Sequence, residues 1–255
     1  MEPIFAVENL TRRFGGLTAL DSIGFSVERG SIFSIIGPNG AGKSTLFNCI
    51  CGVYRPDRGR VLFEGREITA QKPHRIARHG IGRTFQNLEL FRNMTTMENL
   101  MLGRHLHMRS GVWSGAMMFR RLSRAGMEEV EHRERVEHII DLLALHAARD
   151  RFIWQLPYGT QKLIELGRAL AAEPRLLLLD EPAAGMNLEE RHDLIFWIRD
   201  IRDELGVTIV MIEHNMQMVM GISDRVLALD FGRTITEGTP QEVAEHPEVV
   251  RAYLG

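Results

Sequence analysis

The stretch GPNGAGKST at residues 37–45 has the residue types and spacing of a loop that binds phosphate. Glycine permits a tightly bent backbone that approaches an anion closely, and the loop amides and the following helix end can then face it. Lys43 can reach the β- and γ-phosphates of a nucleotide, and the Ser44 hydroxyl can bind Mg²⁺. The predicted nucleotide-binding residues in this stretch are Gly37, Pro38, Asn39, Gly40, Ala41, Gly42, Lys43, Ser44 and Thr45.

A second pair of residues has the chemistry to act on a bound nucleotide. The run RLLLLDEP predicts a buried strand that ends at Asp180, and ligands of parallel sheets collect at the carboxyl ends of strands. Asp180 would hold Mg²⁺ through water. Glu181 would polarise the attacking water as a general base, a role typically worth about 10²–10⁴-fold in rate. Taken alone, the run would fit a surface Asp-Glu pair equally well, but the phosphate loop upstream favours the catalytic interpretation.

These groups need a sheet to position them, and the sequence predicts one. The apolar run SIFSII precedes the loop, and after residue 157 amphipathic helices alternate with the apolar runs RLLLLD and VTIVMIE. That alternation is typical of a parallel sheet covered on both faces. The first third of the chain reads as short strands with alternating apolar residues. The run RVLALDFGRTITEG predicts a hairpin around Phe231-Gly232.

The middle of the chain, about 93–150, reads as mostly helical. In the run 126–148 the apolar residues share one face and the charged residues lie elsewhere, which predicts an amphipathic helix. The residues expected on the apolar face are Val130, Val136, Ile139, Ile140, Leu142 and Leu143. We therefore expect an α/β core built from both ends of the chain, with a helical segment inserted between them.

The composition is that of an ordinary globular protein, with 44% hydrophobic and 25% charged residues among 255. Lys plus Arg (31) nearly balances Asp plus Glu (33), so net charge gives no support to nucleic-acid binding. The first residues lack the pattern of a signal peptide, and no run approaches the roughly 20 apolar residues of a membrane span. At a membrane, the protein would act beside it through a partner. Cys49 and Cys51 are expected to be reduced thiols, partly in the core.

Five short motifs occur in an order that resembles a known family. They are GPNGAGKST, RTFQ at 83–86, LPYGTQ at 156–161, LLLLDEP at 176–182 and IEH at 212–214. Together, over nearly the whole chain, they resemble the ATP-binding subunit of ATP-binding-cassette (ABC) transporters. Phrases such as RFGGLTALD, GRTFQNLELFRNMTTMENL and VVRAYLG look closest to one branch, the ATP-binding subunits of branched-chain amino-acid importers.

The resemblance implies an α/β fold with a P-loop NTPase (RecA-like) core, an antiparallel β subdomain and an inserted α-helical subdomain. It implies a single ABC ATP-binding domain over residues 4–252. About 1–85 and 160–255 would form the nucleotide-binding core with the β subdomain. About 86–159 would form the helical subdomain, with the signature segment at its end. The implied cofactors are ATP and Mg²⁺, and the implied activity is ATP hydrolysis coupled to transport.

The resemblance also implies roles for single residues. Phe14 matches the aromatic residue that stacks on adenine, with a core phenylalanine as the alternative. Gln86 matches the glutamine that touches Mg²⁺ and the water and senses the membrane subunit. His214 matches the switch histidine that contacts the γ-phosphate. The implied catalytic residues are Glu181, His214, Lys43 and Gln86. The implied metal-binding residues are Ser44, Gln86 and Asp180.

LPYGTQ differs from the Leu-Ser-Gly-Gly-Gln that the family usually has at this place. In the family this signature clamps the γ-phosphate of ATP held by the other subunit. The residues implied here are Pro157, Tyr158, Gly159, Thr160 and Gln161. Pro157 removes a hydroxyl and an amide, but Gly159 and the following helix are kept, and proline is tolerated in a first helical turn. We interpret the segment as a weakened but working clamp; a dead clamp paired with an active partner site is the alternative. Asn187 stands where the family often has aspartate, in the loop that crosses the dimer interface.

The resemblance implies protein partners and no nucleic acid. One is a second ABC ATP-binding subunit, either a paralogue or a second copy of this chain. Another is the transmembrane permease, expected to dock near Gln86–Thr95, and an external solute-binding protein would act indirectly. The expected location is the cytoplasmic side of the inner (plasma) membrane, as a peripheral subunit. The segment 105–126 is either a loop packed on its own subdomain, a partner surface, or a patch that touches lipid.

Two other functions are compatible with a phosphate-binding loop. A cassette ATPase acting on nucleic acid or ribosomes usually carries two cassettes or a long coiled coil, and this sequence has neither. A small-molecule kinase would need a phosphoacceptor pocket and would leave LPYGTQ and His214 unexplained. The sequence also leaves the cargo open between branched-chain amino acids, other amino acids, urea-like solutes and aromatic acids.

Overall fold

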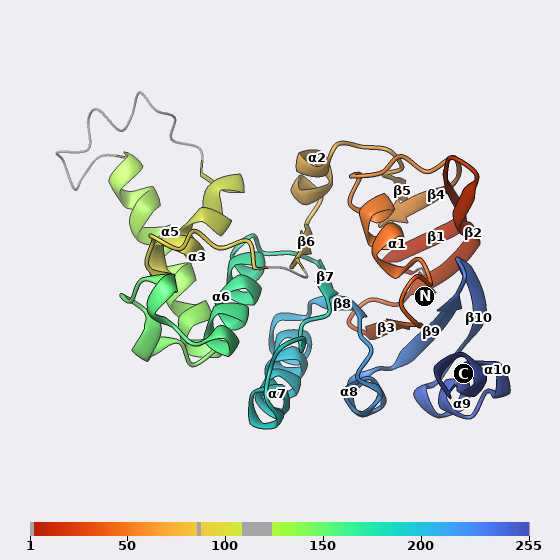
Figure 1. Cartoon of the computed structure of the whole chain (residues 1–255). Coiled ribbons are helices and arrows are strands. Elements are labelled where there is room, and N and C mark those ends of the chain that lie inside the picture. The colour runs from red at the N-terminus through yellow and green to blue at the C-terminus, as the bar shows by residue number, and fades with distance from the viewer. Residues whose placement is uncertain (1–2, 86–87, 109–123, 255) are drawn as a thin grey trace. The chain divides into compact units, whose positions relative to one another are not determined.

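The computed structural model describes residues 3–85, 88–108 and 124–254. Figure 1 shows the helices and strands. The chain forms two compact units. One comprises Met1–Gln86, Arg175–Ala184 and Arg191–Gly255, and the other comprises Asn87–Pro174 and Gly185–Glu190. The first unit is built on two β-sheets, whereas the described part of the second is mainly helical.

A six-stranded sheet forms the centre of the first unit. Its strand order is β10-β9-β3-β8-β7-β6, and neighbouring strands are parallel except β9 and β10. The strands are β3 (Ile32–Ile36), β6 (Ile81–Arg83), β7 (Leu176–Asp180), β8 (Thr208–Ile212), β9 (Arg225–Asp230) and β10 (Arg233–Gly238). Every residue of β3, β7 and β8 is buried, as expected for parallel strands covered on both faces. The predicted parallel sheet is confirmed.

A four-stranded antiparallel sheet, ordered β2-β1-β4-β5, completes the β structure of the first unit. Its strands are β1 (Phe5–Phe14), β2 (Leu17–Val27), β4 (Arg58–Phe63) and β5 (Arg66–Glu67). In β2, Ile23, Phe25 and Val27 are buried and the residues between them are exposed, which is the period-2 pattern of a half-buried strand. These three side chains belong to the same hydrophobic core as Leu46 and Phe47 of the following helix.

The hairpin and the helices of the first unit have local causes in the sequence. Phe231 and Gly232 both have positive φ, 42° and 75°, and such a two-residue turn matches the twist of β9 and β10. The helices are α1 (Lys43–Ile50), α2 (Pro73–Arg78), α7 (Leu188–Leu205), α8 (Met216–Ile222), α9 (Pro240–Ala244) and α10 (Pro247–Leu254). The start of α7, up to Glu190, belongs to the second unit. The start of α9 has a capping box between Thr239 and Glu242, which satisfies N–H groups of its first turn. The predicted hairpin is confirmed.

In the described part of the second unit, three α-helices pack together (Figure 1). They are α3 (Thr96–Gly103), α5 (Arg124–Leu142) and α6 (Tyr158–Ala171), joined by the short 3₁₀ turns η1 (Arg104–Leu106), η2 (His146–Ala148) and η3 (Ile153–Gln155). Gly103 lets α3 approach α6 closely, because a Cβ there would lie 2.4 Å from the Arg168 carbonyl oxygen. Leu100, Ile139 and Leu143 meet around Gly167, so this unit has its own apolar core.

The prediction of a helix over 126–148 is wrong at the C-terminal end of the helix and for one residue of the apolar face. α5 ends at Leu142, because Ala144 adopts a left-handed φ of 52° and the Leu145 N–H returns to the Ile140 carbonyl, a geometry that terminates helices. Val130 is 55% exposed, whereas Val136 is fully buried. The two are six residues apart, which turns their side chains about 120° away from each other.

Two further expectations concern cysteines and membrane spans. Cys49 and Cys51 are free and buried, and burial raises the pKa of each thiol to about 11. Among the described residues, no helix combines the length and the apolar character that crossing a membrane requires.

We expect Val136→Ala to lower the free energy of unfolding by about 2 kcal/mol, because it removes buried methyl groups and leaves a cavity. Val130→Ala, on the exposed side of the same helix, should change it by no more than about 0.5 kcal/mol. Urea unfolding followed by far-UV circular dichroism measures both. Equal losses at the two positions would contradict the assigned buried face of α5.

Candidate nucleotide-binding site

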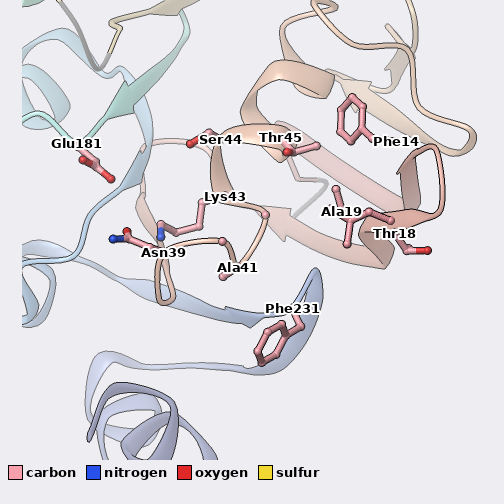
Figure 2. A pocket seen from close by; sticks show the side chains of 13 residues that line it. Phe14, Thr18, Ala19, Asn39, Ala41, Lys43, Ser44, Thr45, Glu181 and Phe231 are labelled. Atoms are coloured by element: carbon pink, nitrogen blue, oxygen red, sulfur yellow. The ribbon is translucent and has the colours of Figure 1, made fainter. Parts of the chain in front are cut away.

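A pocket of about 420 Å³ opens over the phosphate-binding loop (Figure 2). It is lined by Phe14, residues 17–19, residues 39–45, Glu181 and Phe231. All of them belong to the first unit. The pocket thus joins the end of β1, the start of β2, the loop itself, the end of β7 and the β9–β10 turn. Of the predicted loop residues, Gly37 and Pro38 lie outside this lining.

The loop connects β3 to α1 and is held close to β2. Gly42 is the N-cap of α1 with φ of 99°, and a Cβ there would lie 2.6 Å from the Ala19 carbonyl oxygen. A side chain would therefore both strain the backbone and collide with β2. The first N–H groups of a helix have no acceptor within the helix. Because Lys43, Ser44 and Thr45 form the first turn of α1 and line the pocket, their N–H groups can bind an anion there.

Lys43 is buried and bound to the loop itself. Its Nζ donates to the Gly37 carbonyl at 2.7 Å and to the Pro38 carbonyl at 3.0 Å. Burial lowers the pKa of Lys43, while the charges of Glu181 and Asp180 act against that shift. The ammonium group thus lies in the field of both predicted acidic residues. To bind a phosphate it would exchange two neutral carbonyls for a full anion, which is a stronger partner.

Asp180 ends β7 and forms an ion pair that the sequence analysis missed. Its carboxylate accepts from Arg83 Nη2 at 2.9 Å, and Arg83 Nη1 donates to Asn48 Oδ1 at 2.8 Å. Both charged side chains are largely buried. The motif RTFQ contained Arg83, but no local signal tied it to an aspartate 97 residues away. The pair compensates the buried charge of Asp180, which would otherwise be costly.

Glu181 is better placed than Asp180 to act on a bound molecule. It lines the pocket with a side chain that is 18% exposed. His214 Nδ1 lies 4.0 Å from Glu181 Oε2, and its side chain is 59% exposed. The backbone of Glu181 has a left-handed φ of 48°, a conformation that non-glycine residues adopt mainly where the surroundings impose it. The structure therefore brings Glu181 and His214 together beside the loop.

A fully buried carboxylate, Glu213, organises the backbone around these two residues. Its Oε1 accepts from the Ala183 N–H, and its Oε2 accepts from the N–H groups of His214 and Asn215, all at 3.0–3.1 Å. It thereby ties the turn after Glu181 to the end of β8. Glu213 stands within the motif IEH, but no role was predicted for it. The available signal was an acid at the end of the otherwise apolar run VTIVMIE.

Phe14 is a pocket residue and not part of the hydrophobic core. Its ring is 39% exposed and lies edge-on to Tyr54, with centroids 5.2 Å apart. The Arg12 guanidinium lies 4.6 Å from the ring centroid. Phe231, which was predicted only as a turn residue, is 84% exposed at the other side of the pocket (Figure 2). A planar ring bound here would meet aromatic surface at both places.

The comparisons with known proteins bear on what this pocket binds. A family model described as ABC transporter matches residues 20–184. The chain belongs to the ABC transporter family. A second model, described as branched-chain amino acid ATP-binding cassette transporter, matches residues 233–255. The predicted family is therefore confirmed.

The relatives align with the chain over its whole length. The high-affinity branched-chain amino acid transport ATP-binding protein BraF of Pseudomonas aeruginosa is 41% identical, over 99% of this chain and 98% of the relative. LivG of Escherichia coli (strain K12), which has the same description, is 40% identical over 100% and 98%. A solved nucleotide-free cassette from an ABC transporter has a TM-score of 0.85, and the ADP conformation of the cassette MJ1267 has 0.86. Each structure is 34% identical and covered completely, as is this chain. These structures confirm the predicted fold class.

The segment LPYGTQ, predicted to be the signature, lies at the start of α6, in the second unit. Pro157 is the N-cap, one residue before the first turn, and gives no side-chain hydrogen bond to it. The Gln161 N–H still donates to the Pro157 carbonyl at 3.0 Å. Thr160 lies in the first turn. α6 therefore begins at Tyr158, so Pro157 precedes the first turn in which it was predicted, and the helix lacks the side-chain cap that a serine would supply.

Tyr158 packs against the loop before α7, and Gly159 packs against the first turn of α7. A Cβ on Gly185 would lie 2.8 Å from the Tyr158 ring, and one on Gly159 would lie 2.2 Å from a Glu190 carboxylate oxygen. Asn187 and Glu190 exchange hydrogen bonds at 2.9 and 3.0 Å, which caps α7. All of these contacts lie within the second unit. Gln86, predicted as a metal and catalytic residue, lies outside the described residues.

Proposed function

We propose that the chain is the ATP-hydrolysing subunit of an ABC importer for branched-chain amino acids. The full-length similarity to BraF and LivG supports this, because both are named as ATP-binding proteins of branched-chain amino acid transport. The proposed ATP hydrolysis rests on the observation that Lys43 and Glu181 line the same pocket over the phosphate-binding loop. The chain would act as a peripheral subunit at the cytoplasmic side of the inner membrane.

The residues present fit a Mg²⁺ ion that binds together with ATP. Ser44 lines the pocket and Asp180 ends the neighbouring strand β7. Within the described residues, no group of three or more His, Cys, Asp or Glu side chains is arranged to hold a metal. Protein sites for Mg²⁺ typically supply only one or two carboxylates and leave the other positions to phosphate and water. We therefore assign Ser44 and Asp180, together with Gln86, to the ion. When bound, Mg²⁺ would offset negative charge on the phosphates.

The rate of ATP hydrolysis would then depend on how the chain positions the nucleotide and the attacking water and on how it offsets the charge of the phosphates. Lys43 would leave the carbonyls of Gly37 and Pro38 for the phosphates, and Phe14 would stack on the adenine. Glu181 would orient the water that attacks the γ-phosphorus and accept its proton, releasing ADP and phosphate. His214 would contact the γ-phosphate from its place beside Glu181, and Gln86 would contact the metal and the water.

A second ABC subunit would complete each site. In this proposal the start of α6, with Pro157, Tyr158, Gly159, Thr160 and Gln161, contacts the γ-phosphate of ATP bound to the partner. The N–H groups at that helix end, and its dipole, supply the interaction that the missing serine does not. The partner is a second copy of this chain or a paralogue, and closing of the pair would drive the permease.

The permease would dock on an aromatic surface in the second unit. The segment 88–95 pairs by backbone hydrogen bonds with residues 151–154: Trp154 N–H donates to the Arg92 carbonyl, and Ile153 N–H to the Met94 carbonyl. Phe91, Phe152 and Trp154 are exposed on these two segments. Exposed aromatic side chains that lie together are typical of protein interfaces. The segment 105–126 is described only at 105–108 and 124–126, so its role stays a prediction.

Glu181→Gln should lower ATP turnover by at least about 100-fold while ATP still binds, because the amide keeps the shape of the side chain but accepts no proton. The variant should accumulate as an ATP-bound dimer, measured by size-exclusion chromatography with light scattering. Glu204→Gln, an exposed acid in α7, makes the same charge change away from the pocket and should hydrolyse at the wild-type rate. If Glu181→Gln turned over as fast as wild type, the assignment of the general base would be wrong.

Pro157→Ser restores a side-chain cap at the start of α6. If the present segment already clamps phosphate, the serine should change ATP turnover by no more than about fivefold, the worth of one hydrogen bond. The dimer of Glu181→Gln should form without it. A dimer that requires Pro157→Ser, or that forms only after a paralogue is added, would show that this signature is the inactive half of an asymmetric pair.

Phe91→Ala and Trp154→Ala should each weaken binding to the permease by about tenfold or more, because aromatic residues at the centre of an interface carry much of its energy. The basal ATP turnover of the isolated chain should not change. Phe196→Ala removes an equally exposed phenylalanine from α7 and serves as the control. Co-purification with the membrane subunits measures the effect. Loss of binding by Phe196→Ala but not by the other two would refute the proposed surface.

A further inference from the structure

The C-terminal part of the chain contacts the phosphate-binding loop at two separate points. The Gly232 N–H, at the tip of the β9–β10 hairpin, donates to the Ala41 carbonyl at 3.0 Å. The Tyr253 hydroxyl, in α10, accepts from the Gly37 N–H at 2.7 Å. Gly37 begins the loop and Ala41 lies near its middle. Both contacts come from the 23 residues at 233–255 that the branch-specific family model matches, or from the residue just before them.

Gly37 is a position where the backbone needs an acceptor from elsewhere. It is buried, and β3 ends at the residue before it. A Cβ there would lie 2.3 Å from the Leu229 carbonyl oxygen, so β9 already presses against its Cα. A buried N–H without a partner would be costly. Tyr253 supplies that partner from a helix 216 residues away in sequence.

The same glycine also holds the lysine of the loop. The Gly37 carbonyl accepts from Lys43 Nζ at 2.7 Å, while its N–H is bound by Tyr253. The position of residue 37 therefore fixes the place from which Lys43 must move to reach a phosphate. Loss of the hydrogen bond at the Gly37 N–H would therefore also affect Lys43, because the same residue makes both contacts.

Packing holds α10 in the position from which Tyr253 contacts Gly37. Its buried Val249 anchors it, and it packs against α9 and β10. A cleft of about 530 Å³ lies between the loop and α10, lined on the helix side by Glu248, Arg251 and Ala252. Burial raises the pKa of Tyr253, against the hydrogen bond from Gly37. The hydroxyl therefore keeps its proton at neutral pH and accepts through a lone pair.

We infer that Tyr253 is a positioning residue for nucleotide binding, and that the C-terminal segment sets the affinity of the loop through the hydrogen bond to Gly37. The inference rests on the proposed function only in that the loop binds ATP and ADP. Tyr253 is not among the residues that line the pocket over the loop. It acts on the phosphate site by holding the backbone at the residue that presents its carbonyl to Lys43.

Tyr253→Phe tests the inference because it removes the hydroxyl and keeps the ring. We expect the Kd for Mg-ADP, measured by titration calorimetry, and the KM for ATP to rise about fivefold, which corresponds to about 1 kcal/mol. The kcat should stay within about twofold, because the hydrogen bond does not change between bound ATP and the transition state. The thermal midpoint without nucleotide should fall by about 2–4 °C, because the buried Gly37 N–H is left without its partner.

Val250→Ala is the matched control, since Val250 is a partly exposed neighbour in α10 and loses packing without touching the hydroxyl. It should leave both the Kd and the KM unchanged. An unchanged Kd in Tyr253→Phe would overturn the inference, as would the same rise in Val250→Ala. A fall in thermal midpoint without a change in Kd would show a structural role alone and would also overturn it. Failure of the wild-type chain to bind Mg-ADP would instead refute the proposed function.

Discussion

The nucleotide site depends on a loop that must hold its backbone amides toward an anion although it belongs to no strand or helix for most of its length. Neighbouring segments supply the support. β2 approaches Gly42 through the Ala19 carbonyl, and the Gly232 carbonyl in turn accepts from the Asp21 N–H at 2.8 Å. The hairpin tip is thus bonded to the loop and to β2 at once. A backbone cradle held in this way costs little reorganisation when the anion arrives, which is the physical basis of tight phosphate binding.

Burial divides the acids around the site into two kinds. Glu213 and Asp180 are almost fully buried, and each is compensated, by backbone N–H groups in one case and by Arg83 in the other. These partners hold both carboxylates in place, which for Asp180 would fix its position at the proposed Mg²⁺ site. Glu181 differs, since it faces the pocket, with the exposed His214 ring nitrogen 4.0 Å from its carboxylate. The division explains why neighbouring acids at one sheet edge suit different tasks.

The parts of the fold that sequence could predict are those with local causes. The loop between β3 and α1, the strand that ends at Asp180 and the Phe231-Gly232 turn each follow from a few adjacent residues. Arg83 and Tyr253 could not be predicted in their roles, because their partners lie 97 and 216 residues away and a single sequence contains no signal of that pairing. The end of α5 was missed because Ala144, a good helix former, adopts a left-handed conformation there.

The second unit joins its two proposed interaction sites through one helix. In the segment 88–95, the backbone of Glu89 is bound on both sides by α6: its N–H donates to Glu165 Oε1 at 3.3 Å, and its carbonyl accepts from Arg168. Glu165 is almost fully buried, with the buried Lys162 ammonium 3.9 Å away. A buried ionic pair contributes little to stability compared with apolar packing but fixes geometry.

In the proposed function, a permease that binds segment 88–95 would therefore act directly on α6, and the first turn of that helix would be the phosphate clamp. Pro157 changes the chemistry at the start of α6, while Tyr158 and Gly159 keep that end packed against the loop before α7 and the first turn of α7. In this proposal, the mechanical connection from the permease to the clamp would therefore not require a serine at position 157.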